Sequence, residues 1–189
     1  MNLYDFDKTI YNGESGTKFY CFMLLRHPYL FWHIFVVSFW GLMKVLHIAS
    51  VKRFKEKALS IVRFSKNIST DLENFWNKEE KNIFDYYLKN KKDNDVICSA
   101  SPKFLIAPII ERINPTATLI CSNINSKNGK FCDGEQNCKG QTKVERLKKQ
   151  GFSHFENGYS DSLSDKPMLL LCDRAYLVKK GKITPLDKK

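Results

Sequence analysis

The chain has 189 residues, enough for one sizeable hydrophobic core with an insertion but too few for two large domains. Hydrophobic residues make up 43% and aromatic residues 13% of it, which excludes an intrinsically disordered protein. The formal net charge of +11 favours anionic partners such as nucleic acids, phosphorylated metabolites or an acidic membrane surface. The basic residues are scattered along the chain, which favours solvated helix faces and argues against a nucleic-acid-binding protein.

The cysteines indicate a cellular compartment. Six are present, and no two are spaced as Cys-X-X-Cys. No secretory signal precedes the first predicted strand, so we expect reduced thiols in a cytoplasmic protein. Cys132, Cys138 and His154 do not have the spacing of a closed tetrahedral zinc site, and we interpret these cysteines as small, half-buried residues.

The first predicted elements are a strand and a long helical block. Residues 2–6 form a short apolar run that indicates a strand ending in Asp-Phe-Asp. From about residue 17 to residue 90 the pattern is helical, with N-cap signals at Ser50 and at Ser69 or Thr70. No convincing strand interrupts this block.

From Asp95 onward, strand and helix patterns alternate. The predicted elements are a strand at 96–100, a helix at 101–113 capped by Ser101, two strands within 116–131 joined by an Asn-Gly hairpin turn, a helix at 141–150, a strand within 153–162, a helical turn at 167–172 and a last strand at 175–183. Such alternation is typical of a mostly parallel sheet covered by helices on both faces.

We therefore predict an α/β protein with a Rossmann-like three-layer core, a mostly parallel sheet and an inserted all-helical cap. The strand at 2–6 must join the later strands, because no other strand is available to pair with it. The predicted core comprises residues 1–14 and 94–189, and the predicted cap comprises residues 15–93.

Ligands of such sheets bind at the carboxyl ends of the strands, where this sequence places several polar side chains. Asp5 and Asp7 are separated by one residue, so both carboxylates leave the strand end on the same side. Two close carboxylates suit a hard divalent cation such as Mg²⁺, and a hydroxyl and an ammonium suit phosphoryl oxygens. The candidate residues at these positions are Asp5, Asp7, Ser99, Lys143, Asp161 and Asp165.

Four motifs in order carry a family resemblance across almost the whole chain. They are DFDKT at residues 5–9, the serine of CSASP, the lysine of GQTKVERL and the aspartates of YSDSLSDKPML. With these motifs the chain resembles the haloacid dehalogenase (HAD) superfamily of aspartate-nucleophile phosphatases. It is similar to subfamily IB, which carries a helical C1-type cap and includes phosphoserine phosphatases and bacterial phosphatidylglycerophosphate phosphatases.

The resemblance implies roles for the three aspartates nearest the reaction. Asp5 would attack phosphorus and form an aspartyl-phosphate, and Asp7 would protonate the leaving oxygen and later activate water. Asp5, the backbone carbonyl of Asp7 and Asp161 would bind Mg²⁺. Asp5 would stay ionised beside the cation while Asp7 held a proton, which agrees with these roles.

The resemblance also implies supporting roles. Ser99 and Lys143 would hold the phosphoryl oxygens, Asp165 would support the metal or Lys143, and Thr9 would brace the loop. Ser99 could instead cap the following helix, although Ser101 is better placed to do so. Three other lysines are alternatives to Lys143 and are interpreted as solvated helix charges, namely Lys139, Lys148 and Lys149.

The substrate depends on the cap. Glu14 follows Asp5 by nine residues, the spacing at which phosphoserine phosphatases carry a glutamate for the substrate's amino group. Those enzymes also place an arginine in the cap for the substrate's carboxylate, but the matching segment FKEKALSIVRF is apolar at that point. Arg53 or Arg63 could replace it.

Residues 29–49 are unusually aromatic and apolar. Their length suits a transmembrane helix, but His33, Ser38, Lys44 and His47 weaken that interpretation, and a buried hairpin of the cap is an alternative. With the positive charge of the chain, this segment predicts peripheral contact with an anionic membrane. The segment is similar to the cap of the phosphatidylglycerophosphate phosphatases, which act on a lipid headgroup.

Three functions are therefore compared. The leading one is a Mg²⁺-dependent phosphomonoester hydrolase acting on a small phosphorylated metabolite such as phosphoserine. The alternatives are a membrane-associated lipid-phosphate phosphatase that docks through residues 29–49, and a non-enzymatic, basic nucleic-acid-binding module. The complete set of candidate catalytic residues argues against the third.

Overall fold

The computed structural model describes residues 1–187, and its elements alternate as the sequence predicts. The strands are β1 (Asn2–Tyr4), β2 (Val96–Pro102), β3 (Thr118–Ser122), β4 (Phe155–Ser160), β5 (Cys172–Lys179) and β6 (Lys182–Pro185). The helices are α1 (Ser15–Arg26), α2 (His33–Val45), α3 (Val51–Leu59), α4 (Ile68–Glu79), α5 (Asp85–Asn90), α6 (Lys103–Ile113), α7 (Gln141–Lys149) and α8 (Lys166–Leu169).

The strands form one six-stranded sheet in the order β3-β2-β1-β4-β5-β6. All neighbours are parallel except β5 and β6, so the expected mostly parallel sheet is confirmed. Leu3 of β1 lies opposite Val96 of β2 on one side and Gly158 of β4 on the other. The strand that precedes the Asp-Phe-Asp sequence is therefore in the middle of the sheet, where successive connections leave in opposite directions.

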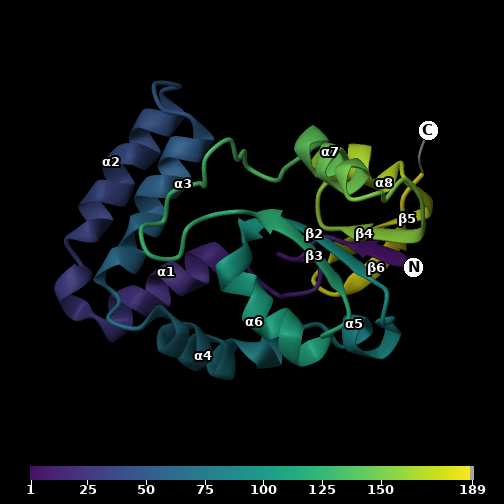
Figure 1. The fold of residues 1–189 in the computed structure, drawn as a ribbon, viewed down its shortest axis with the longest axis horizontal. Coiled ribbons are helices and arrows are strands. Elements are labelled where there is room, and N and C mark those ends of the chain that lie inside the picture. Colours follow the sequence, from purple (N-terminus) through teal and green to yellow (C-terminus); the bar gives the residue numbers. More distant parts are fainter. Residues whose placement is uncertain (188–189) are drawn as a thin grey trace.

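Helices cover both faces of the sheet, which makes three layers (Figure 1). On one face, Tyr4 and Ile97 share a core with Ile106 and Ile109 of α6. On the other face, their strand neighbours belong to a second core with α7 and α8, which includes Leu147 and Met168. Successive strand residues thus point to opposite faces, and each face is buried by its own helices.

Helices α1 to α5 lie between β1 and β2 in the sequence and form the helical insert, residues 15–93. Within it, α2 and α3 form a pair that stands away from the sheet (Figure 1). Helix α4 lies on the core instead, where the Trp76 indole donates to the Leu105 carbonyl at 2.7 Å. The Ser50 hydroxyl caps α3, as predicted. The second cap prediction was wrong: the Asn67 side chain, which can also accept a backbone N–H, caps α4 in place of Ser69 or Thr70.

Three other local predictions were wrong. The predicted last strand at 175–183 is two antiparallel strands, β5 and β6, which are joined by a turn at Lys180 and Gly181. Ser101 does not cap α6, because its hydroxyl bonds to the Asp7 carboxylate and Pro102 takes the N-cap position. In the described residues, the segment after β3 is a loop with one bridge between Ile124 and Phe131, not a second strand. This loop is held by contact with α3, since Ile124 and Phe131 share a small hydrophobic cluster with Leu59.

Gly129 lets this loop approach α3, and we expect Gly129→Ala to destabilise the protein by at least about 2 kcal/mol. Its φ is +70°, and a Cβ atom there would lie 2.3 Å from the Leu59 carbonyl oxygen. Gly134→Ala is the matched control, because φ is +72° but nothing lies within 4 Å of its Cβ position. Urea unfolding measures both, and equal losses would show that the close contact contributes nothing.

Candidate active site

The polar side chains predicted at the strand ends line one cavity of about 650 Å³. Asp5 directly follows β1, Ser99 lies in β2, and Asp161 directly follows β4. These three strands are neighbours, so their carboxyl ends bring the side chains together. The opposite wall of the cavity comes from α1, α2 and α3 of the helical insert, which contribute apolar residues such as Phe19, Val37 and Phe54.

A buried ion-pair network lies at the sheet end of the cavity. The Lys143 ammonium donates to the Asp5 carboxylate at 2.6 Å and to the Asp165 carboxylate at 2.7 Å. The Ser160 hydroxyl donates to Asp165 at 2.9 Å. Lys148 and Lys149 are exposed on α7, so of the lysines on this helix it is Lys143 that reaches Asp5.

Burial and charge shift the protonation of this network. Burial raises the pKa of Asp5 to about 7, against the lowering effect of the Lys143 ammonium. Burial also lowers the pKa of Lys143, but the carboxylates of Asp5 and Asp165 outweigh it and hold that pKa above its usual value. The lysine therefore remains a cation and stabilises the ionised form of Asp5.

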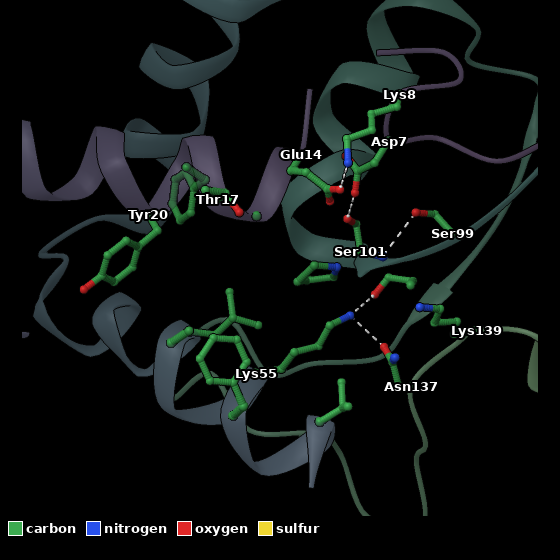
Figure 2. Close-up of a pocket in the computed structure, with 18 of the residues that line it drawn as sticks. Asp7, Lys8, Glu14, Thr17, Tyr20, Lys55, Ser99, Ser101, Asn137 and Lys139 are labelled. Carbon is green, nitrogen blue, oxygen red and sulfur yellow. Dashed lines mark hydrogen bonds and ion pairs between the residues drawn. The ribbon is translucent and has the colours of Figure 1, made fainter. Parts of the chain in front are cut away.

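Two hydrogen-bond donors hold the Asp7 carboxylate in place just beyond the carboxyl end of β1. The Ser15 backbone N–H donates to one carboxylate oxygen at 2.8 Å. The Ser101 hydroxyl donates to the other at 2.5 Å (Figure 2). Burial raises the pKa of Asp7, although both hydrogen bonds lower it. A carboxyl group that keeps its proton more readily than usual suits general acid catalysis.

Ser101→Ala is expected to shift the pH dependence of kcat. Loss of the hydrogen bond to ionised Asp7 raises the pKa of Asp7 further, so the alkaline limb, where Asp7 loses its proton, should move up by about one pH unit. Ser15→Ala is the comparison variant: it removes the Ser15 hydroxyl, which bonds to the Ser101 hydroxyl and also lowers the pKa of Asp7, but it keeps the Ser15 N–H and the Ser101 hydroxyl, so its shift should be smaller. A profile unchanged in Ser101→Ala would contradict a proton-transfer role for Asp7.

The structure also places the remaining predicted residues. Ser99 is buried and lines the cavity, and its hydroxyl accepts the backbone N–H of Ser101 at 3.1 Å. Thr9 is buried within the loop after β1, where its carbonyl accepts a hydrogen bond from the Tyr86 hydroxyl at 2.6 Å. Glu14 lines the cavity and forms an ion pair with Lys8, whose backbone adopts a left-handed φ of 57° (Figure 2).

Sequence reasoning missed Lys55, which comes from the FKEKALSIVRF segment. Its ammonium points into the cavity from α3 and donates to the Asn137 side chain at 2.7 Å and the Ala100 carbonyl at 3.1 Å (Figure 2). Burial lowers the pKa of Lys55. Arg53 and Arg63 line a different cleft, so the suggestion that one of them supplies the cavity's cation was wrong.

The donor set of the cavity fits a hard divalent cation. Asp5 and Asp161 both line it, and burial raises the pKa of each, as expected for carboxylates that have lost hydration and would gain from a nearby cation. Within residues 1–187, no group of three or more His, Cys, Asp or Glu side chains is arranged to hold a metal ion. The expected set needs two carboxylates and the backbone carbonyl of Asp7.

Comparisons with known proteins agree with this architecture. No curated protein matches the sequence. A solved structure of a protein of unknown function from Bordetella pertussis Tohama I is 17% identical, with a TM-score of 0.73 over 93% of this chain and 87% of that chain. A phosphoserine phosphohydrolase-like protein from Francisella tularensis subsp. tularensis SCHU S4 is 18% identical, with a TM-score of 0.53 over 92% and 84% of the two chains.

A substrate-bound phosphoserine phosphatase is 14% identical, with a TM-score of 0.54 over 92% of this chain and 83% of that chain. At these identities the similar structures establish the fold. The model of haloacid dehalogenase-like hydrolases matches residues 3–170, which span the whole cavity wall contributed by the sheet. The chain belongs to the haloacid dehalogenase-like hydrolase family.

Proposed function

We propose that the protein is a Mg²⁺-dependent phosphomonoester hydrolase that works through an aspartyl-phosphate. The observation that carries the proposal is the buried Asp5 carboxylate, 2.6 Å from the Lys143 ammonium, in a cavity that also holds Asp7 and Ser99. The cation favours the ionised form of Asp5 and is available to the phosphoryl oxygens, so a nucleophile and a stabiliser of negative charge lie side by side.

In the proposed reaction, an Asp5 oxygen forms a bond to phosphorus as the bond from phosphorus to the leaving oxygen breaks. Asp7 gives its proton to that oxygen, and the product alcohol departs. Asp7 then takes a proton from water, which attacks phosphorus, releases inorganic phosphate and regenerates the Asp5 carboxylate. Ser99 and Lys143 hold the phosphoryl oxygens in both steps, while Asp165 orients Lys143.

The magnesium ligands in this proposal are Asp5, the Asp7 carbonyl and Asp161. When bound, the cation neutralises charge on the phosphoryl group and on the carboxylates. Hydrolysis of p-nitrophenyl phosphate by the purified protein tests the function: phosphate release should require added Mg²⁺ and stop with EDTA. Metal-independent release, or none over a broad panel of phosphomonoesters, would reject it.

We propose that residues 15–93 act as the cap of this site and choose its substrate. The support is that α2 and α3 form the wall opposite Asp5, with Lys44 and Lys55 as its charged groups, and that Glu14 lines the same cavity just before α1. A glutamate and a lysine in one cavity suit a small leaving group with an ammonium and a carboxylate, such as that of phosphoserine. Two of the similar structures are named as phosphoserine phosphatase or phosphoserine phosphohydrolase-like protein.

Lys55→Met is expected to lower kcat/KM for phosphoserine at least about tenfold more than kcat/KM for p-nitrophenyl phosphate, which has no carboxylate for Lys55 to bind. Lys52→Met is the matched control, since Lys52 lies on the same helix but lines a different cleft. Equal losses for the two substrates would show that Lys55 does not recognise a carboxylate.

A second candidate is a membrane-associated lipid-phosphate phosphatase. It is favoured by the apolar lining that α2 and α3 give to the cavity, through residues such as Val37, Val51 and Phe54. Such a wall suits a phosphate monoester joined to an apolar group better than a free zwitterion. Parallel assays with phosphoserine, sugar phosphates and phosphatidylglycerophosphate in mixed micelles separate the two candidates by kcat/KM.

A further inference from the structure

The outer side of α2 is an apolar surface open to solvent. Five of its large hydrophobic side chains and that of the C-cap residue Leu46 are at least 40% exposed, and two of them, Phe35 and Val45, reach 78% and 71%. We call this set the apolar face: Ile34, Phe35, Phe39, Leu42, Val45 and Leu46. A contiguous surface of this kind is uncommon on a protein that functions alone in water, and it indicates a partner.

The length and packing of α2 fit a helix lying on a membrane rather than crossing it. Residues Pro28–Val45 are long and apolar enough to span a bilayer by length and composition alone. The α-helical part has only 13 residues, about 20 Å, against a hydrocarbon thickness of about 30 Å. Its inner side is committed to the protein, since buried His33 contacts Tyr20 at 3.2 Å and Ser60 at 3.0 Å.

A basic cleft of about 600 Å³ is lined by residues of α2 and α3 that do not line the catalytic cavity. Its single carboxylate, Glu56, accepts the Phe131 backbone N–H at 3.1 Å. In the part of the chain that the structure describes, none of its five cations forms an ion pair with a carboxylate. These cations are Lys52, Arg53, Lys57, Arg63 and Lys130.

The basic cleft and the apolar face both involve α2: Val36 lines the cleft, and Phe35 and Phe39 belong to the apolar face. The Arg53 guanidinium and the Lys57 ammonium each lie 5.0 Å from the ring centre of Trp40, which faces α3. Trp32, which is 48% exposed, lies at the edge of the cleft. An apolar helix side beside an aromatic residue and cations that have no carboxylate partner has the chemistry of a helix at a bilayer interface.

We infer that the helical insert carries a site for an anionic phospholipid bilayer, separate from the catalytic cavity. The apolar face enters the boundary between headgroups and acyl chains, and the basic cleft takes the phosphate of a lipid headgroup. The complementarity of charge selects the bilayer over a second copy of this chain, whose own basic cleft would bring like charges together. Binding does not depend on phosphate hydrolysis.

The first test is co-sedimentation of the full chain with vesicles of phosphatidylcholine, with and without phosphatidylglycerol. We expect the wild type to bind the mixed vesicles and to bind pure phosphatidylcholine vesicles at least about tenfold more weakly. On the mixed vesicles, F35E/F39E should lose at least about tenfold in affinity relative to the wild type. The matched control L88E/L170E changes two exposed leucines outside α2 and should bind like the wild type. Equal binding by F35E/F39E and the control would overturn the inference.

The second test addresses the basic cleft. K52E/R63E should lose at least about tenfold in affinity for the mixed vesicles, whereas K148E/K149E, which makes the same change in net charge on α7, should lose much less. Equal losses would show that only net charge matters and would remove the cleft from the site. Light scattering of the free protein decides the remaining alternative: a dimer broken by F35E/F39E, without vesicle binding, would assign the apolar face to a second copy.

Hydrolysis of p-nitrophenyl phosphate in solution keeps this inference distinct from the proposed function. All four double variants should retain wild-type hydrolysis, because none of the changed residues lines the catalytic cavity. Vesicle binding by a protein with no phosphatase activity would reject the proposed function and leave the membrane site intact. Phosphatase activity without vesicle binding would support the proposed function and reject the membrane site.

Discussion

Asp5→Asn is expected to reduce kcat for p-nitrophenyl phosphate by about 10⁴-fold or more while the protein stays folded. An amide oxygen is a poor nucleophile and cannot form the aspartyl-phosphate. The fold should tolerate the change because asparagine has nearly the same shape and Lys143 keeps its ion pair with Asp165 at 2.7 Å. Rapid acid quench and mass spectrometry should locate one phosphoryl group on Asp5 of the wild type and none on the variant.

Asp93→Asn is the control for this measurement, because Asp93 is exposed and lies outside the cavity. It should leave both kcat and the phosphorylated intermediate unchanged. A fully active Asp5→Asn protein, or a phosphoryl group found on Asp7, would overturn the assignment of the nucleophile.

Lys143→Met is expected to cost about 3–5 kcal/mol of folding free energy as well as activity. The lysine is 2% exposed and is bonded to two carboxylates, so methionine would fill its volume but leave both carboxylates buried without a cation. Lys148→Met makes the same change at an exposed position of the same helix and should have little effect. Urea unfolding in EDTA measures the difference.

The loss in Lys143→Met should depend on pH. Burial already raises the pKa of Asp5 from 3.8 to about 7, and removing the lysine removes an influence that lowers it. Between these values the folded state holds more protons than the unfolded state, so stability falls as pH rises from about 4 to beyond 7. The variant should therefore be more stable at pH 5 than at pH 8, and a pH-independent loss would contradict the unpaired-carboxylate explanation.

The parts of the fold that follow local periodicity could be predicted from the sequence. Strand and helix patterns after Asp95 have distinct periods, and the parallel sheet follows from their alternation. The placement of Asp5, Ser99 and Asp161 in one cavity followed as well, since parallel strands end at one edge of the sheet. The roles of these residues in catalysis remain predictions.

The parts set by distant contacts could not be predicted. Ser101 has the local pattern of a helix cap, but the half-buried Asp7 carboxylate, 94 residues away in the chain, competes for its hydroxyl. The Asn-Gly sequence at 128–129 has the local pattern of a hairpin, yet its glycine serves a close approach to Leu59. Lys55 could have been found from its helical spacing only if the packing direction of α3 had been known.

The central position of β1 has a consequence for the order in which the protein folds. Its three residues pair with β2 at Val96 and with β4 at Gly158, so β1 has no neighbour until β2 has been synthesised and lacks its second neighbour until β4 has been synthesised. Contacts of such long sequence separation form late and slowly. The nascent chain should therefore expose its most buried strand for longest, and a pause in translation before β4 would leave this strand open to chaperones and to aggregation.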